Sequence, residues 1–461
     1  MILFMKVGKI KSGFISNDIR FNAGYFLNED AINSRIVESN SSKCRQLFEL
    51  AEVWNPPIFK RQFCANSERA VPYFQSSDVT NALEGSDVFI NKKQAYKVGS
   101  IVEKDQILVT GFGTIGNTRL VNELSHGSSF ANNVCRIKAN ENVPIGYVYA
   151  FMTSKYGKSQ LNKNASGSVV RYIESPGIKK TLIPILPEET QQKIHNLIVE
   201  SAQLRVEANK LLREAVEKIE NFLREDNSKK SLTGKVSISA IKNNYQSRID
   251  SPTYVNSSVT FWNQKKESKI NFFSIEELGF KVTRPGIFKR VKVDGTNGIP
   301  YIKGSELNKL NPFSNCEYLS KSRTPFLDEL KLKVNQILFT CAGTVGDVRL
   351  ISKEFEDFNA VGSQDIIRIE ENISSVSVYY LFAFLKTNFA REFAQSLKYG
   401  SVIERVEPFH VDLIPVAIPE EKIYNKIISA VAKYNDVMYM AFNNEKIAID
   451  LIEKEIDQWQ Q

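Results

Sequence analysis

The chain contains two copies of one pattern. When the sequence is shifted against itself by about 230 residues, its halves match in order, spacing and residue type. Residues 113–120 (GTIGNTRL) align with residues 343–350 (GTVGDVRL). Shorter matches in the same order are FKR at 59–61 and 288–290, GSV at 167–169 and 400–402, and LIP at 182–184 and 413–415. The duplication predicts two globular modules of the same fold, one after the other.

Each copy ends in a long helical segment that opens with Pro-Glu-Glu, at residue 187 and again at residue 419. These residues suit the first helical turn, where a missing N–H is tolerated and the helix dipole favours negative charge. Apolar residues then recur at steps of three and four, which is typical of a coiled coil. An amphipathic helix lying on its own module is the alternative. Glu445 interrupts the second apolar seam. We expect antiparallel pairing through Ile194, Leu197, Leu204, Leu211, Ile427, Val431, Tyr434 and Met438.

Short apolar runs rich in β-branched residues predict strands at 71–74, 106–110 and 119–121, and at the matching 299–303, 336–340 and 349–351. Helical patterns cover 148–163 and 378–397. We predict a mixed α/β fold with two similar modules, each holding a twisted, partly antiparallel sheet and followed by a long helix, with pseudo-twofold symmetry. The expected bounds are 1–185 and 227–417 for the modules and 186–226 and 418–461 for the helices, with a polar link at 225–233.

The charge balance points to a polyanionic partner. The chain has 60 Lys and Arg against 52 Asp and Glu, with a net charge of +8 and a pI near 8.9, and such a basic balance attracts nucleic acid. Five scattered cysteines without a C-x-x-C pair favour a reducing compartment over a disulfide framework or a zinc site. No apolar run approaches the length of a membrane span, and the apolar start is too short for a signal peptide. We expect a cytoplasmic protein.

Two motifs suggest nucleotide chemistry, but neither is complete. Residues 111–116 (GFGTIG) fit the G-x-G-x-x-G pattern of dinucleotide sites. The second copy lacks the first glycine, however, and a strand rather than a helix is expected after the motif. Residues 55–58 (NPPI) resemble the Asn-Pro-Pro-aromatic signature of adenine methyltransferases, but isoleucine has no ring to stack on a flipped base. A glycine turn between strands and a loop breaker explain the two motifs better.

The candidate DNA contacts are cations, amides, hydroxyls and aromatics near the shared motifs, because such groups bind phosphates and base edges. A solvated surface loop is the alternative for each. The first copy offers Lys60, Arg61, Ser77, Thr114, Asn117, Arg119, Asn132, Asn133, Lys163, Ser168, Arg171 and Tyr172. The second copy offers Lys289, Arg290, Ser305, Thr344, Arg349, Gln364, Lys398, Tyr399, Ser401 and Arg405. No Ser/His/Asp set or carboxylate cluster emerges, so the sequence predicts no catalytic and no metal site.

The order of the motifs resembles one family. In each copy a Pro-Tyr pair precedes I-L-x-T-x-x-G-T-x-G-x-x-R-L, then G-S-V, then L-I-P leading to Pro-Glu-Glu and a long helix. Two tandem modules of this kind are similar to the specificity (S) subunit of type I restriction–modification systems. The resemblance covers essentially the whole chain, and the duplicated order is more specific than any single motif.

This resemblance implies a non-catalytic DNA-recognition subunit. Each module would be a target recognition domain that reads one half of a bipartite, asymmetric DNA sequence. The helices would set the spacing and dock two methyltransferase (M) subunits, and restriction (R) subunits would complete the complex. AdoMet, ATP and Mg²⁺ would be bound by those partners and not by this chain. Two alternatives stay open: an S-like subunit of a type IIB or other phage-defence system, and a non-DNA assembly scaffold.

Overall fold

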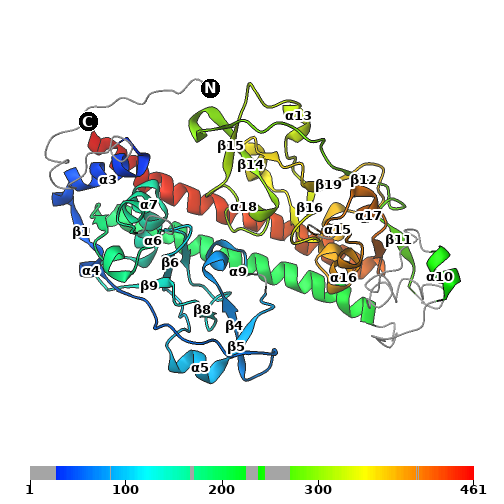
Figure 1. Ribbon diagram of the computed structural model, residues 1–461, viewed down its shortest axis with the longest axis horizontal. Helices are drawn as coiled ribbons and strands as arrows, with labels where there is room; N and C mark the ends of the chain where they lie inside the picture. Colours follow the sequence, from blue (N-terminus) through cyan, green and yellow to red (C-terminus); the bar gives the residue numbers. More distant parts are fainter. Residues whose placement is uncertain are drawn as a thin grey trace. The chain divides into compact units, whose positions relative to one another are not determined.

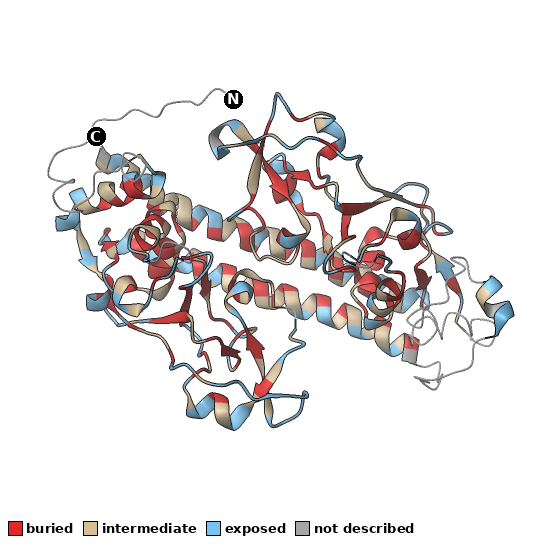
Figure 2. Cartoon of the chain, viewed as in Figure 1, coloured by how far each residue is buried: buried red, intermediate tan, exposed pale blue. Residues whose placement is uncertain are grey.

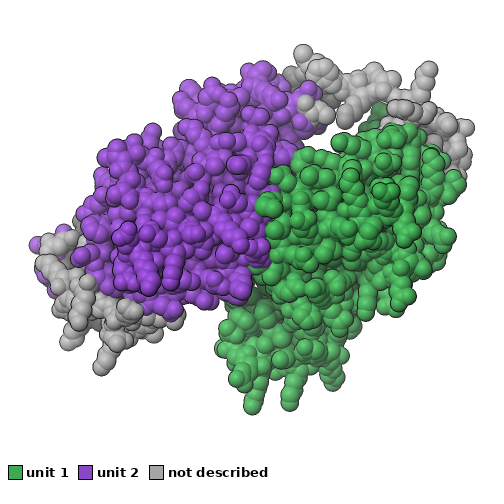
Figure 3. All heavy atoms as spheres, turned by 180° about the vertical axis from the view of Figure 1, so that it is seen from behind, with its two compact units in different colours: residues 1–206, 440–461 green, residues 207–439 purple. Residues whose placement is uncertain are grey.

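The chain forms two compact units (Figures 1 and 3). The computed structural model describes residues 27–83, 85–166, 171–224, 237–243, 270–400, 402 and 404–460, so the expected link at 225–233 lies outside the described residues. Unit 1 comprises residues 1–206 and 440–461, and unit 2 comprises residues 207–439. Both boundaries fall inside the long helices. Each unit therefore holds one module and a part of each long helix.

The described part of unit 1 has three sheets. The largest core lies against an antiparallel sheet of order β2-β9-β6-β7, formed by Ala51–Trp54, Val134–Ala139, Ile107–Thr110 and Thr118–Leu120. The second sheet has the order β3-β5-β4-β8, formed by Phe63–Cys64, Phe89–Asn91, Ala70–Phe74 and Ser129–Phe130; its β4–β8 pairing is parallel. The third pairs β1 (Cys44–Gln46) with β10 (Leu182–Pro184).

Unit 2 repeats this topology strand for strand. Its first sheet is β12-β19-β16-β17, formed by Phe280–Thr283, Ile366–Glu371, Ile337–Thr340 and Val348–Leu350. Its second is β13-β15-β14-β18, formed by Lys292–Val293, Glu317–Ser320, Gly298–Ile302 and Val361–Gly362; its β14–β18 pairing is again parallel. Its third pairs β11 (Phe272–Ser274) with β20 (Pro415–Ala417). The predicted duplication and the mixed α/β class are confirmed.

Short helices complete both modules. Those of unit 1 are α3 (Glu29–Ser39), α4 (Leu47–Leu50), α5 (Lys92–Lys97), α6 (Ile145–Thr153), α7 (Lys155–Lys163), α8 (Ser175–Ile178) and the 3₁₀ turns η1 (Ser41–Lys43), η2 (Ser76–Thr80) and η5 (Gln458–Gln460). Those of unit 2 are α10 (Ile238–Asn243), α13 (Leu327–Leu330), α14 (Lys353–Asp357), α15 (Val378–Leu385), α16 (Asn388–Ser396), α17 (Pro408–Asp412), η3 (Gly295–Asn297) and η4 (Gly304–Glu306). No described helix combines the length and apolar character that a bilayer span needs.

The helical patterns at 148–163 and 378–397 each prove to be two helices. The hydroxyl of Ser154 accepts a hydrogen bond from the N–H of Gly157 (3.3 Å), and the hydroxyl of Thr387 accepts one from the N–H of Ala390 (3.2 Å). Serine and threonine at such N-caps satisfy a free backbone donor of the next helix. The chain changes direction at the capping residue, but the apolar residues keep their helical spacing across it. The spacing alone therefore does not reveal that one helix ends and another begins.

The long helices α9 (Glu188–Arg224) and α18 (Glu421–Asp457) pair with each other and also belong to the module cores. In unit 1, Ile194 and Ile198 of α9 share a core with Ile452 of α18 and with the β2-β9-β6-β7 sheet. In unit 2, Leu212 of α9 and Ile427 of α18 lie in one core. Buried positions recur along both helices (Figure 2). Helix pairing and an amphipathic helix on its module, posed as alternatives, therefore both hold.

Each long helix contacts both the other helix and a module, and this changes which of its residues are buried. Of the predicted seam residues, Ile194, Ile427 and Val431 are buried, whereas Leu197, Leu204, Leu211, Tyr434 and Met438 are half-buried. The buried line of α9 runs one residue later, through Ile198, Arg205 and Leu212. A helix that faces both a partner helix and a module needs a wider apolar stripe than a two-stranded coiled coil. The heptad pattern therefore located the stripe but described it as too narrow.

Candidate nucleic-acid interface

Three loops of unit 1 meet at one end of the β2-β9-β6-β7 sheet: two follow β2 and β6, and the third connects α7 to α8 and pairs with the second. They are residues 55–62 (the tip loop), 111–117 (the glycine turn) and 164–174 (the return loop), of which residues 164–166 and 171–174 are described. Asn55 ties the tip loop down: its Nδ2 donates to the carbonyl of Asn132 (3.1 Å), and its Oδ1 accepts from the N–H of Ser175 (3.0 Å). The base of the tip loop is therefore fixed to the segment that leads into β9 and to the first residue of α8, directly after the return loop.

Gly111 joins the glycine turn to the other segments. Its N–H donates to the carbonyl of Asn133 (3.1 Å), and its carbonyl accepts from the N–H of Ile173 (2.8 Å). A Cβ at this position would collide with the carbonyl oxygen of Ile173. The first glycine of the G-x-G-x-x-G pattern is thus needed for close backbone packing.

Unit 2 builds the same arrangement with other side chains. Its tip loop is 284–291, its glycine turn 341–347 and its return loop 398–407, of which residues 401 and 403 are not described. The guanidinium of Arg284 pairs with the carboxylate of Glu407 (2.9 Å), which ties the tip loop to the return loop. The N–H of Phe288 donates to Oε1 of Gln364 (3.3 Å). The equivalent tethers at Asn55 and Arg284 show a shared scaffold that carries different residues.

The glycine turn is a β-hairpin turn in both units. Gly113 and Gly116 have φ angles of 73° and 80°, and the equivalent Gly343 and Gly346 have 75° and 96°. Only glycine adopts this left-handed region without a steric cost. The turn connects two antiparallel strands, β6 and β7 in unit 1 and β16 and β17 in unit 2. The tight-turn interpretation of this motif is confirmed.

Cations and aromatic rings are displayed on the loops of unit 1. Lys60, Arg61 and Arg171 are exposed. The ring of Tyr172 stacks on that of Phe112, with centroids 5.5 Å apart and planes at 17°. This pair joins the return loop to the glycine turn, and its partly exposed faces offer an apolar surface beside positive charge. Such a combination binds both phosphates and bases.

Unit 2 displays a more balanced charge at the equivalent place. Lys289 and Arg290 are exposed as their counterparts are, but Lys398 is paired with Glu404 on the return loop. The hydroxyl of Tyr399 donates to the carboxylate of Glu407 (2.7 Å). The exposed loops of the two units therefore differ in charge.

Two of the predicted DNA-contacting arginines are structural. Arg119 is only 2% exposed, and its guanidinium donates to the carbonyls of Val79 (2.9 Å) and Asn81. Arg349 in unit 2 donates in the same way to the carbonyls of Leu307 (3.0 Å) and Lys309 (2.7 Å). Burial lowers the pKa of Arg119 to about 10. Both arginines pin the segment after a 3₁₀ turn to the sheet, which leaves no free guanidinium for a phosphate.

Replacing Arg119 with methionine is expected to lower the free energy of unfolding by about 2–3 kcal/mol, because a buried and a partly buried carbonyl lose a charged donor. The midpoint of urea unfolding measures this change. Lys138→Met, at an exposed position on β9 of the same sheet, is the matched control and should have little effect. Unchanged stability together with a shallower salt dependence of DNA binding would instead return Arg119 to the phosphate contacts.

A second pair of arginines was missed as a structural feature, although it recurs in the repeat. Arg136 is buried and donates to the carbonyls of Ser100 and Phe130, both at 3.0 Å. Arg368 in unit 2 donates to the carbonyl of Leu330 (3.0 Å). The sequence does contain a signal for this role: an arginine stands between apolar residues in both copies, as in Cys135-Arg136-Ile137.

The remaining candidates have varied surroundings. Lys163 forms an ion pair with Glu38 (2.9 Å), and Ser305 donates to Glu306 (2.9 Å). Those that are exposed or half-buried near the loops are Ser77, Thr114, Asn117, Asn132, Asn133, Thr344, Gln364 and Arg405. Ser168 and Ser401 lie outside the described residues. Nowhere in the described chain do three His, Cys, Asp or Glu side chains gather as a metal site would require.

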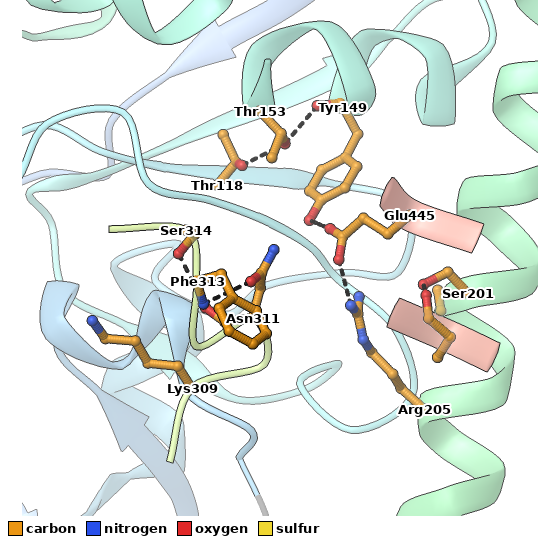
Figure 4. A network of polar contacts seen from close by, with 12 residues as sticks. Thr118, Tyr149, Thr153, Ser201, Arg205, Lys309, Asn311, Phe313, Ser314 and Glu445 are labelled. Atoms are coloured by element: carbon orange, nitrogen blue, oxygen red, sulfur yellow. Dashed lines mark hydrogen bonds and ion pairs between the residues drawn. The ribbon is translucent and has the colours of Figure 1, made fainter. Parts of the chain in front are cut away.

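Glu445, the break in the apolar seam, is the centre of a buried polar network in unit 1 (Figure 4). It accepts hydrogen bonds from the hydroxyl of Tyr149 on α6 and from the guanidinium of Arg205 on α9. Burial alone would raise the pKa of Glu445, but the charge of Arg205 and the two hydrogen bonds hold it below its usual range. Beside it, the hydroxyl of Ser201 donates to the carbonyl of Ala441 (2.7 Å). The network joins α9, α18 and the module.

One family model matches most of the chain. A family model described as type I restriction modification DNA specificity domain matches residues 40–218 and 267–448. Among solved structures, the S subunit of a type I restriction–modification system from M. genitalium is 13% identical, covers 90% of this chain and 92% of its own, and has a TM-score of 0.32. The HsdS subunit from Thermoanaerobacter tengcongensis is 12% identical, with 90% and 95% covered and a TM-score of 0.27. No curated protein sequence matches the chain.

Proposed function

The chain belongs to the family of type I restriction–modification DNA specificity domains, and from this premise we propose that each of its modules reads one half of a bipartite, asymmetric DNA target. One observation carries the proposal. The same three loops meet at the same end of the equivalent sheet in both units, yet they display different side chains, such as the stacked Phe112 and Tyr172 in unit 1. Equal scaffolds with unequal surfaces suit two half-sites of different sequence.

The long helices would fix the gap between the half-sites and dock the methyltransferase subunits. Each has 37 residues, and an α-helix of that length extends about 55 Å. One turn of DNA is about 34–36 Å long, so a helix of this size suits a spacer between two contact regions.

Catalysis would reside on partner subunits. Two methyltransferase subunits would supply AdoMet chemistry, and restriction subunits would supply ATP-driven and Mg²⁺-dependent steps. This chain would contribute sequence recognition and assembly, in the cytoplasm where chromosomal DNA is accessible. The candidate contacts of this chain for DNA are the exposed loop residues, led by Lys60, Arg61, Lys289 and Arg290.

Deleting the gene is expected to remove one gapped, asymmetric adenine-methylation motif from the genome, because no other chain would direct the methyltransferase to that site. Long-read sequencing that detects methylated adenine measures this loss. A plasmid copy of the intact gene should restore the motif, and a frameshifted copy should not. An unchanged set of methylated motifs, or loss of a motif without a gap, would contradict the proposed function.

A further inference from the structure

An isoleucine at the crest of each tip loop is almost entirely exposed. Ile58 is 88% exposed in unit 1, and Ile287 is 89% exposed in unit 2. The two are equivalent, since each directly precedes the shared Phe-Lys-Arg sequence. Leaving a large aliphatic side chain in water forgoes the free energy that its burial would contribute. An exposed isoleucine at the same position in both modules therefore indicates that another molecule covers it.

The loop around each isoleucine is anchored, so the side chain cannot simply fold back. The following residue turns inward: Phe288 is buried with its ring edge-on to Tyr301 (6.3 Å), and Phe59 packs against the equivalent core. Asn55 and Arg284 fix the bases of the two loops through the bonds described above. Each isoleucine thus projects from a supported backbone.

The surroundings indicate which molecule covers the isoleucines. Lys60 and Arg61 follow Ile58, Lys289 and Arg290 follow Ile287, and all four cations are exposed. A single aliphatic side chain is too small for the apolar core of a protein–protein interface. DNA, in contrast, places apolar base surfaces between rows of phosphates, and proteins that bind it use isoleucine and similar residues against its bases.

We propose that Ile58 and Ile287 contact DNA bases, one in each half-site, while the neighbouring lysine and arginine bind the flanking phosphates. The proposal rests on the proposed function and adds the residues that would touch base surfaces. Because the contact is apolar, losing it should weaken affinity without changing the number of phosphate contacts.

The test uses the chain assembled with its methyltransferase subunits and a fluorescent duplex that carries the methylated motif. Ile58→Ala and Ile287→Ala should each lower the affinity about tenfold, equal to about 1.4 kcal/mol, while the slope of log affinity against log salt stays unchanged. Lys60→Ala should reduce that slope by about 1. Ile373→Ala is the matched control: Ile373 is 84% exposed beyond the opposite end of the unit 2 sheet, and the equivalent position in unit 1 is Glu141.

A 2-aminopurine base in each half-site distinguishes two forms of the contact. Fluorescence that rises with the wild-type complex, but not with the alanine variant, supports insertion between bases. Unchanged fluorescence together with the loss of affinity supports contact in a groove, for example with a thymine methyl group. Both results sustain a base contact.

Three results would overturn the proposal. If both alanine variants bind the motif as tightly as the wild type, the isoleucines do not touch bases, although the proposed function stands. If the variants lose methyltransferase subunits during size-exclusion chromatography and retain full DNA affinity once assembled, the surface is a protein contact. If the wild-type complex does not prefer the motif over a scrambled duplex, the proposed function fails and this inference fails with it.

Discussion

Replacing Glu445 with leucine lowers the free energy of unfolding by an expected 3–5 kcal/mol or so, the usual cost of leaving a buried ion without its partner. Arg205 and Glu445 are both more than nine-tenths buried, so the guanidinium would keep its charge without a carboxylate beside it. The hydroxyl of Tyr149 would also lose its acceptor. Urea unfolding of the full chain, followed by circular dichroism, measures the effect.

Unit 2 supplies the design of the control. At the positions equivalent to Tyr149, Arg205 and Glu445 it has Phe382, Met438 and Leu212, and it holds its helices together without this network. The triple variant Tyr149→Phe, Arg205→Met, Glu445→Leu should therefore recover most of the lost stability, since apolar residues can replace a buried ion pair at little cost. A harmless Glu445→Leu, or a triple variant as unstable as the single one, would show that the ion pair contributes little.

The same network predicts a dependence on pH. The pKa of Glu445 in the folded chain lies below its usual value of 4.5, so the unfolded chain takes up this proton first as the pH falls. The stabilisation is complete above about pH 5.5 and is lost as the pH decreases through the folded pKa. The difference in urea midpoint between the wild type and Glu445→Leu should accordingly shrink in acid.

Much of the fold follows from the duplicated sequence. The hairpin turn needs a left-handed backbone that glycine alone adopts without a steric cost, so Gly113 and Gly343 allowed the hairpin and its two strands to be placed from residue type. In the β3-β5-β4-β8 sheet only β4 was predicted, at 71–74, because strands as short as Phe63–Cys64 carry too little periodicity to identify them. On α9 the residues after Leu197, Leu204 and Leu211 are the buried ones, because a heptad describes a helix with one partner, whereas α9 has two neighbours.

The exposure of the candidate DNA-contacting side chains could be predicted only for those that lie in a loop. Lys60 and Arg61 follow a loop breaker, and they are exposed as expected. Arg119 and Arg349 also stand next to loop residues in the sequence, but they extend inward to carbonyl groups that are about 40 residues away in the chain. A sequence does not reveal whether a guanidinium will find carbonyl acceptors inside the protein or phosphates outside it. Glu445 raised the same difficulty, and its partners only became apparent in three dimensions.

Replacing residues 1–183 with the matching module of another specificity subunit is expected to change one half of the recognised DNA sequence completely and leave the other half intact. All three loops of unit 1 and their tethers, from Asn55 to Ser175, lie inside this segment, whereas those of unit 2 lie at 284–407. The long helices are retained, so the gap between the half-sites should keep its length. Long-read detection of methylated adenine, in cells that express the partner subunits, gives the new motif directly.

The packing of unit 1 determines how the exchange must be made. Its core includes Ala448, Ile452 and Ile456 from the end of α18, so a foreign module must fit side chains that come from outside the exchanged segment. A second chimera that also exchanges residues 440–461 preserves this fit and separates a folding defect from a recognition defect. Both chimeras should yield the same new half-site, the second with higher stability. If a folded and assembled chimera altered both halves, or neither, then the two modules would not read the target independently, and recognition would have to arise from the chain as a whole.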